Sequence, residues 1–422
     1  MIALPGAPRG EHTSGCLFKE REMQGKQENG NVVCFCLAYL LSAFGYEFMV
    51  FVMTVHIYDL TGSALNVGLF TALTFLPRLF SPYYGSLSDR YPRGRIFSVA
   101  AMGIALGVFL VAGISGIAWT YIIWFFISIL LMTIMNVRPA IMTEILPQDN
   151  YLHGNAIMLV SLNAARLAAP MIGGVVALKW NVALLLHLTA VVYVAAALLG
   201  LATRLAPVPQ NASRSVDTVF AHMREGGRYL LANRDLRYLG TVAFLWRLCL
   251  GCQLPLFVVY VKQFLGRGSD GYGLFMTMAG VGSVLGSVLG PRLAAKFDRR
   301  KLIQWGLVAH YVSFACLGVT RSFPVSIALV TISFAFFYTT IVSTHSLRDQ
   351  ATPIEYRGRV YGFIVGILTP AALVSFLVGS YLAGVIGVEK VLIGAGGLAL
   401  VTLAVLEMKQ ASPVPAPSVT TD

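Results

Sequence analysis

Charged residues are scarce in this sequence: of its 422 residues, only 12% are Asp, Glu, Lys or Arg, while 57% are hydrophobic. A soluble domain carries about a quarter charged residues, so a soluble fold is excluded. Apolar runs of about 18 residues or more recur along the whole chain, and each can cross a bilayer core of about 30 Å. The composition therefore predicts an integral membrane protein that crosses the lipid bilayer repeatedly.

Several kinds of functional motif are also missing. The sequence has no G-x-x-x-x-G-K-[ST] motif, so it carries no nucleotide-driven motor. The 7 histidines are scattered and form neither a metal-ligand cluster nor a nucleophile-and-base set. The 6 cysteines lie in apolar runs or in the N-terminal tail, which argues against a disulfide framework. We therefore expect no enzymatic activity, no metal and no cofactor, and any work must be driven by an ion or substrate gradient.

Twelve apolar segments are long enough to cross a membrane. They are too long and too uniformly apolar for barrel strands, which alternate over about ten residues, and helices satisfy every backbone group in lipid. The sequence therefore predicts an all-α membrane protein with twelve transmembrane helices in two six-helix bundles, residues 31–203 and 238–408. The segments are 33–57, 65–88, 96–114, 117–139, 154–178, 182–203, 238–262, 270–294, 301–320, 324–345, 358–385 and 389–408.

Two basic turns indicate that the bundles arose by internal duplication. Residues 85–95 (GSLSDRYPRGR) and 290–301 (GPRLAAKFDRRK) each join two apolar segments, and their first glycines are 205 residues apart. At the same offset, residues 66–70 (NVGLF) match residues 271–275 (GYGLF). Two similar halves imply a pseudo-two-fold axis along the membrane normal, with a pathway between the halves.

The basic residues predict the orientation of the chain. If both termini are cytoplasmic, 23 of the 31 Lys and Arg residues lie on the cytosolic side, so the net charge of +12 reflects membrane topology and implies no nucleic-acid partner. This predicts a multi-pass protein of the inner or plasma membrane. Residues 1–30 and 409–422 are predicted to be disordered cytosolic tails, and residues 204–237 a cytosolic linker with an amphipathic helix over 217–231.

The turn at residues 85–95 resembles the loop after the second helix in the major facilitator superfamily, which reads roughly G-x-x-x-D-R-x-G-R-R. Pro92 replaces the inner glycine of that pattern, and Gly94 stands where a basic residue is usual. The resemblance covers residues 31–408. It implies the major facilitator fold, a monomer, and alternating access to a central cavity. The matching residues are Gly85, Asp89, Arg90, Arg93 and Arg95.

Four further stretches are similar to the drug:proton antiporter branch, which includes macrolide efflux proteins and the enterobactin exporter. They are residues 58–63 (YDLTGS), 166–174 (RLAAPMIGG), 224–230 (REGGRYL) and 356–360 (YRGRV). This likeness implies a secondary active transporter that exports a small amphipathic compound, such as a drug or a siderophore-like molecule, in exchange for protons. The expected partners are therefore a small-molecule substrate, protons or another coupling ion, and the bilayer.

Charged side chains inside a bilayer are costly, so each one is a functional candidate. Glu47 is the only acidic residue well inside a predicted helix; such a carboxylate can exchange a proton and compete with a cationic substrate. Alternatively, it forms a structural ion pair with Arg78 or Arg166. Arg78, Arg166 and Arg247 can line the cavity, and several of them unpaired would favour an anionic substrate over a cationic drug.

The resemblance gives the turn at residues 85–95 a role in gating, carried by Gly85, Asp89, Arg90 and Arg93. Asp89 can cap a helix end and pair with a cation near the cytosolic surface. Topogenic charge alone is the other interpretation. The remaining basic residues of this cluster are Arg95 and Arg138, the latter a possible partner of Asp89. Small or kinking residues that let helices approach closely are Pro170, Gly173, Gly174, Gly282, Gly286 and Gly290.

Other functions fit the same residues. An uptake carrier or a lysophospholipid flippase would share the fold, and the flippase would show an apolar cavity open sideways between helices. A transporter-like sensor or assembly protein that does not transport is a further alternative, which the divergent Pro92 and Gly94 favour.

Overall fold

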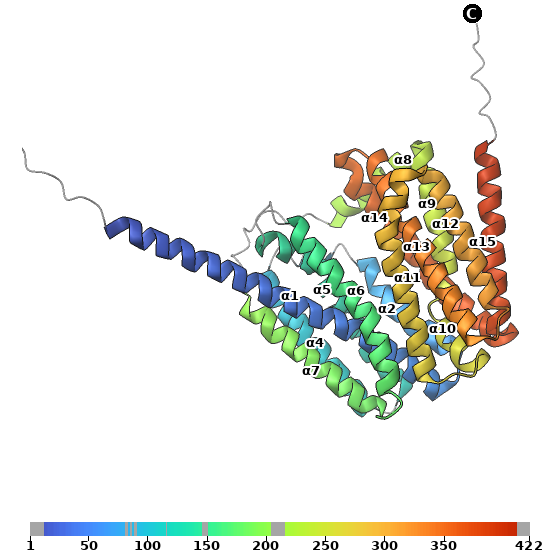
Figure 1. Cartoon of the computed structure of the whole chain (residues 1–422), viewed down its shortest axis with the longest axis horizontal. Helices are drawn as coiled ribbons and strands as arrows, with labels where there is room; N and C mark the ends of the chain where they lie inside the picture. The colour runs from blue at the N-terminus through green and yellow to red at the C-terminus, as the bar shows by residue number, and fades with distance from the viewer. Residues whose placement is uncertain are drawn as a thin grey trace, which may run out of the picture.

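The computed structural model describes residues 12–80, 83–84, 87, 91–114, 116–145, 151–203 and 216–411, which are almost entirely helical (Figure 1). The N-terminal half contains α1 (His12–Thr61), α2 (Ala64–Phe75), η1 (Leu76–Phe80), α4 (Arg93–Gly113), α5 (Ile117–Ile145), α6 (Tyr151–Val176) and α7 (Val182–Ala202). The C-terminal half contains α9 (Arg234–Gly251), α10 (Leu256–Val259), η3 (Tyr260–Phe264), α11 (Ser269–Lys296), α12 (Arg299–Leu317), α13 (Phe323–Ala351), α14 (Ile354–Ile386) and α15 (Val388–Ala411). The predicted all-α membrane fold is confirmed.

Nine helices in the described part of the chain are long and apolar enough to cross a membrane, and the second, seventh and ninth of the twelve predicted spans are not among them. The ninth forms the helix α12 (Arg299–Leu317), which is not counted among those nine. The second predicted span is described without a gap as far as Phe80, as α2 followed by the 3-10 turn η1, which begins one residue before Pro77. The seventh is divided into α9, α10 and the π-helical turn η3, with Pro255 just before α10. Proline removes a backbone donor and clashes with the preceding turn, so it interrupts a helix at both places.

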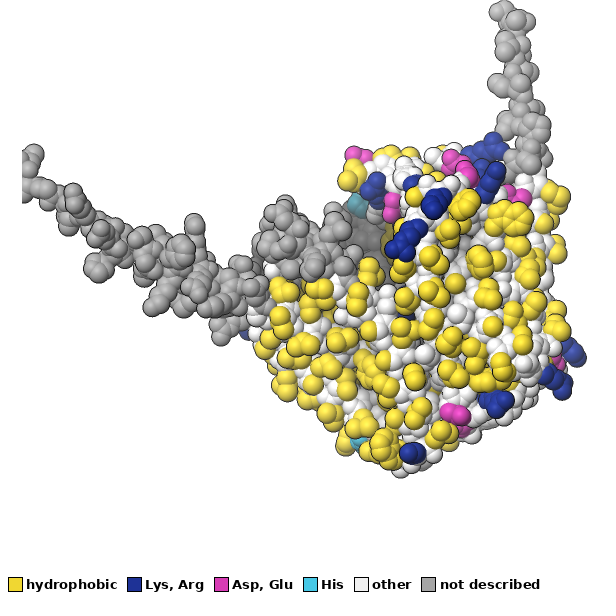
Figure 2. Space-filling model, viewed as in Figure 1, with side chains coloured by type: hydrophobic (Ala, Val, Ile, Leu, Met, Phe, Trp, Pro, Cys, Tyr) yellow, Lys and Arg dark blue, Asp and Glu magenta, His cyan; other side chains and the backbone are white. Residues whose placement is uncertain are grey.

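The outer surface has the composition of a lipid-facing protein. Hydrophobic side chains cover the visible flank of both halves, and Lys and Arg gather toward the upper and lower edges of the C-terminal half (Figure 2). Leu106 on α4, Val191 on α7 and Leu398 on α15 are 61%, 65% and 70% exposed. A contiguous apolar surface of this kind is not stable in water, and it fits the predicted bilayer environment.

The halves meet along two helix pairs, α6 with α11 and α2 with α14. They diverge toward the side where α1 begins and α15 ends, which we call the open end; the opposite side is the closed end (Figure 1). At the closed end the helices touch through small residues. A Cβ on Gly174 would stand 2.9 Å from the Cα of Gly273, and a Cβ on Gly68 would collide with Ser380. Because glycine has no side chain, the backbones of the two halves can approach closely at these positions.

A helix of the central linker, α8 (Val216–Ala232), coincides with the predicted amphipathic helix. It lies against the first turns of α14. A Cβ on Gly226 would collide with the Arg359 carbonyl, the Tyr229 ring stacks on Tyr356 with centroids 4.7 Å apart, and Arg359 pairs with Glu225 at 2.5 Å. The linker helix is thereby docked on the C-terminal half.

The N-terminal segment differs from the prediction of a disordered tail over residues 1–30. The backbone is helical from His12, so residues 12–30 continue the first membrane helix outward. This stretch contains several good helix formers and no proline, which allows the helix to propagate. The predicted C-terminal tail over residues 409–422 lies outside the described residues beyond Ala411.

Candidate functional site

The polar centre of the molecule lies midway along α1, at Glu47. The neighbouring Gly45 leaves room for the Tyr193 ring, which packs where a Cβ would otherwise stand. The Glu47 Oε1 atom accepts a hydrogen bond of 3.2 Å from Nε of Arg166 on α6. Of the two side chains, 21% of Glu47 and 33% of Arg166 remain exposed. The structure thus brings Glu47 together with one of its two predicted partners, in a pair that solvent or a ligand can still reach.

Arg166 also contacts the other half of the molecule. Its Nη1 donates a hydrogen bond of 3.3 Å to the hydroxyl of Tyr338 on α13. The guanidinium lies 6.0 Å from the centroid of the same ring. Side chains from α1, α6 and α13 therefore form one polar contact across the halves, and we call it the central contact. Any motion that separates the halves at this depth has to break or remake it.

Arg78 and Arg247 add positive charge near the central contact. Arg78, in η1, lies within electrostatic range of Arg166 and of Arg247. Arg247, on α9, lies with its guanidinium 5.1 Å from the centroid of the Trp246 ring. Its Nε is buried without a hydrogen-bond partner. Glu47 is the one carboxylate among the four predicted candidates, so their summed charge is positive.

The gating prediction falls partly outside the described residues, which do not include Gly85, Asp89 and Arg90. Arg93, at the start of α4, pairs with Glu144 near the end of α5. Burial raises the pKa of the Glu144 carboxyl, and the Arg93 guanidinium opposes that rise. This pair ties α4 to α5 at the open end of the N-terminal half.

The other two basic residues of the predicted gate also lie in the N-terminal half. Arg138 on α5 donates a hydrogen bond to the hydroxyl of Tyr39 on α1, with its guanidinium 4.8 Å from that ring's centroid. The Arg95 side chain is exposed. A contact between Arg138 and Asp89 stays a prediction.

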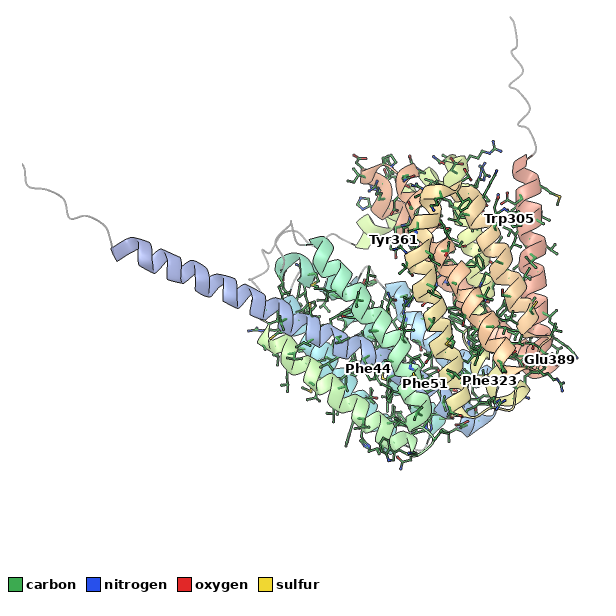
Figure 3. The ribbon with its side chains drawn as sticks, viewed as in Figure 1. Phe44, Phe51, Trp305, Phe323, Tyr361 and Glu389 are labelled. Atoms are coloured by element: carbon green, nitrogen blue, oxygen red, sulfur yellow. The ribbon has the colours of Figure 1, made fainter. Side chains whose placement is uncertain are left out.

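The predicted packing residues lie where helices touch. Pro170 and Gly174 face Gly273 of α11 across the two halves, and a Cβ on Gly273 would stand 2.6 Å from the Pro170 carbonyl oxygen. Inside the N-terminal half, Gly173 makes room for the ring of Phe51, which is labelled in Figure 3. The Phe51 ring stacks on Tyr272 of the other half, with ring centroids 5.1 Å apart. In the C-terminal half, the residues that bring α11 against the backbone of α13 are Gly282, Gly286 and Gly290.

Among the contacts between the halves that were not predicted from sequence, two join polar side chains. Tyr338 is one of 18 tyrosines, and nothing in its neighbourhood distinguishes it. The second contact joins Lys262, in η3, to Asp59 at the end of α1, with Nζ 2.6 Å and 2.8 Å from the two carboxylate oxygens. The sequence does contain a signal for this pair, because Asp59 ends the first helix of the N-terminal half, Lys262 ends the first predicted helix of the C-terminal half, and their charges are opposite. The distance between the two residues, however, depends on how the halves dock.

The family model described as Major Facilitator Superfamily matches residues 35–266 and 239–421, which together make up most of the chain. The chain belongs to the Major Facilitator Superfamily. A member of this superfamily with these apolar helices is a multi-pass membrane transporter and not an enzyme. The resemblance carried by the turn at residues 85–95 is thereby confirmed.

Two similar curated proteins come from bacteria: one is named as an efflux pump and the other as a transporter of the superfamily. The "Multi-drug resistance efflux pump PmrA homolog" of Lactococcus lactis subsp. lactis (strain IL1403) is 23% identical over 368 residues, which cover 83% of this chain and 87% of that protein. The "Uncharacterized MFS-type transporter YfiS" of Bacillus subtilis (strain 168) is 22% identical over 360 residues, covering 82% and 85%.

Solved structures of the same fold include other transporters. The nucleoside transporter NupG superposes with a TM-score of 0.74 at 12% identity, covering 91% of this chain and all of that one. A bacterial homologue of the lysosomal transporter Spinster, in an inward-facing occupied conformation, gives 0.69 at 15% identity, covering 91% and 98%. At these identities the likeness shows the fold alone.

Proposed function

We propose that this superfamily member is a secondary active transporter that works by alternating access and exports a small amphipathic compound in exchange for protons. The observation that carries the proposal is the central contact, in which the carboxylate of Glu47 holds Arg166 and Arg166 holds Tyr338 of the other half. The ionisation state of Glu47 can therefore affect a contact between the two halves, which move relative to each other during alternating access. The name of the efflux-pump relative supports export as the direction.

Glu47 is the proton carrier of this proposal. An ionised Glu47 binds Arg166 through a charge-assisted hydrogen bond, which is stronger than a bond between neutral groups. When a proton joins the carboxylate, Arg166 loses its counter-charge, and the balance between its two partners changes. The proton enters Glu47 while the cavity faces outward and leaves it when the cavity again faces inward, so one proton crosses the membrane in each cycle. A change in one ionisation state thus shifts the equilibrium between the two facing conformations.

The open end faces the cytosol in this proposal. The helix α1 begins and α15 ends on that side (Figure 1), and the excess of Lys and Arg in the flanking segments favours a cytosolic location. The arrangement seen is then the inward-facing state of a monomer in the inner or plasma membrane. In that state Glu47 is ionised and paired. The turn at residues 85–95, with Arg93 and Arg95 on its α4 side, serves as the cytosolic gate.

Proton movement in proteoliposomes tests the role of Glu47. The native protein is compared with Glu47→Gln, which keeps the size and removes the titration, and with Glu47→Asp, which keeps the charge. Cationic dyes, macrolides and catecholate siderophores serve as cargo. We expect a transported compound to drive proton flux in the native protein and in Glu47→Asp, and no flux in Glu47→Gln although it still binds the compound. Equal proton flux in Glu47→Gln, or transport without proton movement, would show that Glu47 does not couple the two.

A further inference from the structure

The C-terminal half contains a cavity whose described lining comes entirely from its own helices and includes Arg247. It has a volume of about 230 Å³ and lies among α9, α12, α13 and α14. Tyr361, one of its lining residues, lies on the side of the C-terminal half nearest the N-terminal half (Figure 3). We call it the C-half cavity. Its apolar wall includes Leu239, Val242, Leu307 and Phe337.

Unsatisfied polar atoms concentrate in this cavity. Eight buried side-chain nitrogen or oxygen atoms lack a hydrogen-bond partner in the described part of the chain, and four of them belong to residues that line the C-half cavity. Thr340 is only 5% exposed. A buried polar group without a partner is costly, and a ligand in this cavity would supply the four missing partners. The atoms are Trp246 Nε1, Arg247 Nε, Thr340 Oγ1 and Thr344 Oγ1.

The charge in the C-half cavity is positive. Arg247 and Arg348 both line it, and no Asp or Glu is among its described lining residues. Arg348 does pair with the adjacent Asp349 at 2.9 Å, but that carboxylate is 49% exposed and lies outside the lining. A planar guanidinium with free donors is suited to carboxylate, sulfate or phosphate oxygens. An ammonium group would meet two like charges in the same space.

We propose that the C-half cavity binds a small amphipathic anion, whose apolar part lies against the aliphatic and Phe337 wall while its anionic head contacts Arg247 and Arg348. The hydroxyls of Thr340 and Thr344 and the Trp246 Nε1–H donate the remaining hydrogen bonds to the head. The volume is below the range of about 300–1,000 Å³ typical of drug-sized sites, so the apolar part is one short chain or one ring. This inference rests on the proposed function in one respect: it takes the molecule bound in the C-half cavity to be the exported compound, and it identifies that compound as an amphipathic anion.

The direction of transport agrees with the charge of this occupant. An anion that leaves the cell moves down an inside-negative membrane potential, and a proton that enters does the same. The membrane potential therefore drives both the export of the anion and the entry of the proton.

Three probes with the same eight-carbon tail test the C-half cavity: octanoate, octanol and octyltrimethylammonium. Binding to the full chain in lipid nanodiscs is followed by tryptophan fluorescence, with Trp246→Phe to show that the signal comes from the cavity. We expect octanoate to bind tightest. Because hydrogen bonds to charged groups contribute more than neutral ones, Arg247→Gln and Arg348→Gln should each weaken octanoate binding about 10-fold or more and leave octanol unchanged. Arg247→Lys should restore part of the affinity, and Lys301→Gln, exposed and outside the cavity, should change nothing.

Two results would overturn the inference. One is octyltrimethylammonium binding as tightly as octanoate, and the other is octanoate binding that neither arginine substitution weakens. Transport separates this inference from the proposed function. If octanoate binds as described but does not cross proteoliposome membranes while other compounds do, the occupant is not the cargo. If octanoate crosses and Glu47→Gln leaves its proton flux intact, the proton-coupling proposal fails and the anion site stands.

Discussion

The halves of this transporter touch in two different ways at two depths. At the closed end, Gly174 meets Gly273 and Gly68 meets Ser380, so backbones lie against each other with almost no side chain between them. At mid-depth, the central contact is made by long polar side chains, and two of its three members are charged. The first contact depends on volume and the second on charge.

This difference indicates how each region can change state. Close-packed surfaces do not deform continuously; they lose all their contacts together. At the closed end the two halves are therefore either in full contact or apart. A hydrogen-bonded ion pair can instead be weakened by a single proton without any change in volume. We infer that the closed end defines the two facing states and that the central contact sets the balance between them. Three substitutions sharpen or break this comparison.

The largest effect should follow from Gly174→Val, because the Cβ of the new side chain would stand only 2.9 Å from the Gly273 Cα. Overpacking costs about 1–3 kcal/mol, and here the cost falls on the inward-facing state. Transport in proteoliposomes should drop steeply, and Tm should fall. Gly397→Val on α15 is the matched control, since nothing lies within 4 Å of its would-be Cβ. If the two variants transport equally well, the closed end is not a close-packed seam.

Tyr338→Phe should have an intermediate effect. It removes a hydrogen bond from Arg166 and keeps the ring, a loss of about 0.5–1.5 kcal/mol that moves the equilibrium between facing states by a few-fold to about tenfold. Spin labels at the exposed positions Tyr91 and Ile354, on a cysteine-free background, would report the separation of the halves at the open end. Tyr381→Phe, 59% exposed on α14, is the control. An unchanged distance distribution in Tyr338→Phe would remove the central contact from the switching mechanism.

The smallest effect should come from Asp59→Asn, at the rim of the closed end. The Asp59 carboxylate is 50% exposed, and exposed ion pairs contribute about 0.2–1 kcal/mol. We expect Tm at low salt to fall slightly and the difference from the native protein to vanish at high salt, where such pairs are screened. A loss as large as that of Gly174→Val would mean that charge and not volume holds the closed end.

The helices of this fold could be predicted because the length of an apolar run is a property of the sequence. Their interruptions were less visible: Pro77 and Pro255 lie inside the predicted segments 65–88 and 238–262, and a proline can bend a membrane helix or divide it. The helical backbone over residues 12–30 was not predicted, and polarity alone does not prevent helix formation.

The candidate site could be predicted only in part. Glu47 was identified by its charge within an apolar run, and Arg166 was one of two expected partners. The choice between Arg166 and Arg78 depends on how α1 crosses α6, which sequence spacing does not define. The C-half cavity was out of reach for the same reason, since its unsatisfied atoms come from α9 and α13, almost a hundred residues apart.

The docking of α8 on α14 has a practical consequence for dividing the molecule. By sequence the linker begins after α7, but Gly226, Tyr229 and Glu225 fasten its helix to the first turns of α14. Two half-molecules expressed from separate genes should therefore be divided before Val216, so that α8 remains with the C-terminal half. A division after Ala232 would leave Gly226 and Tyr229 on the wrong polypeptide and expose the surface of α14 that they cover.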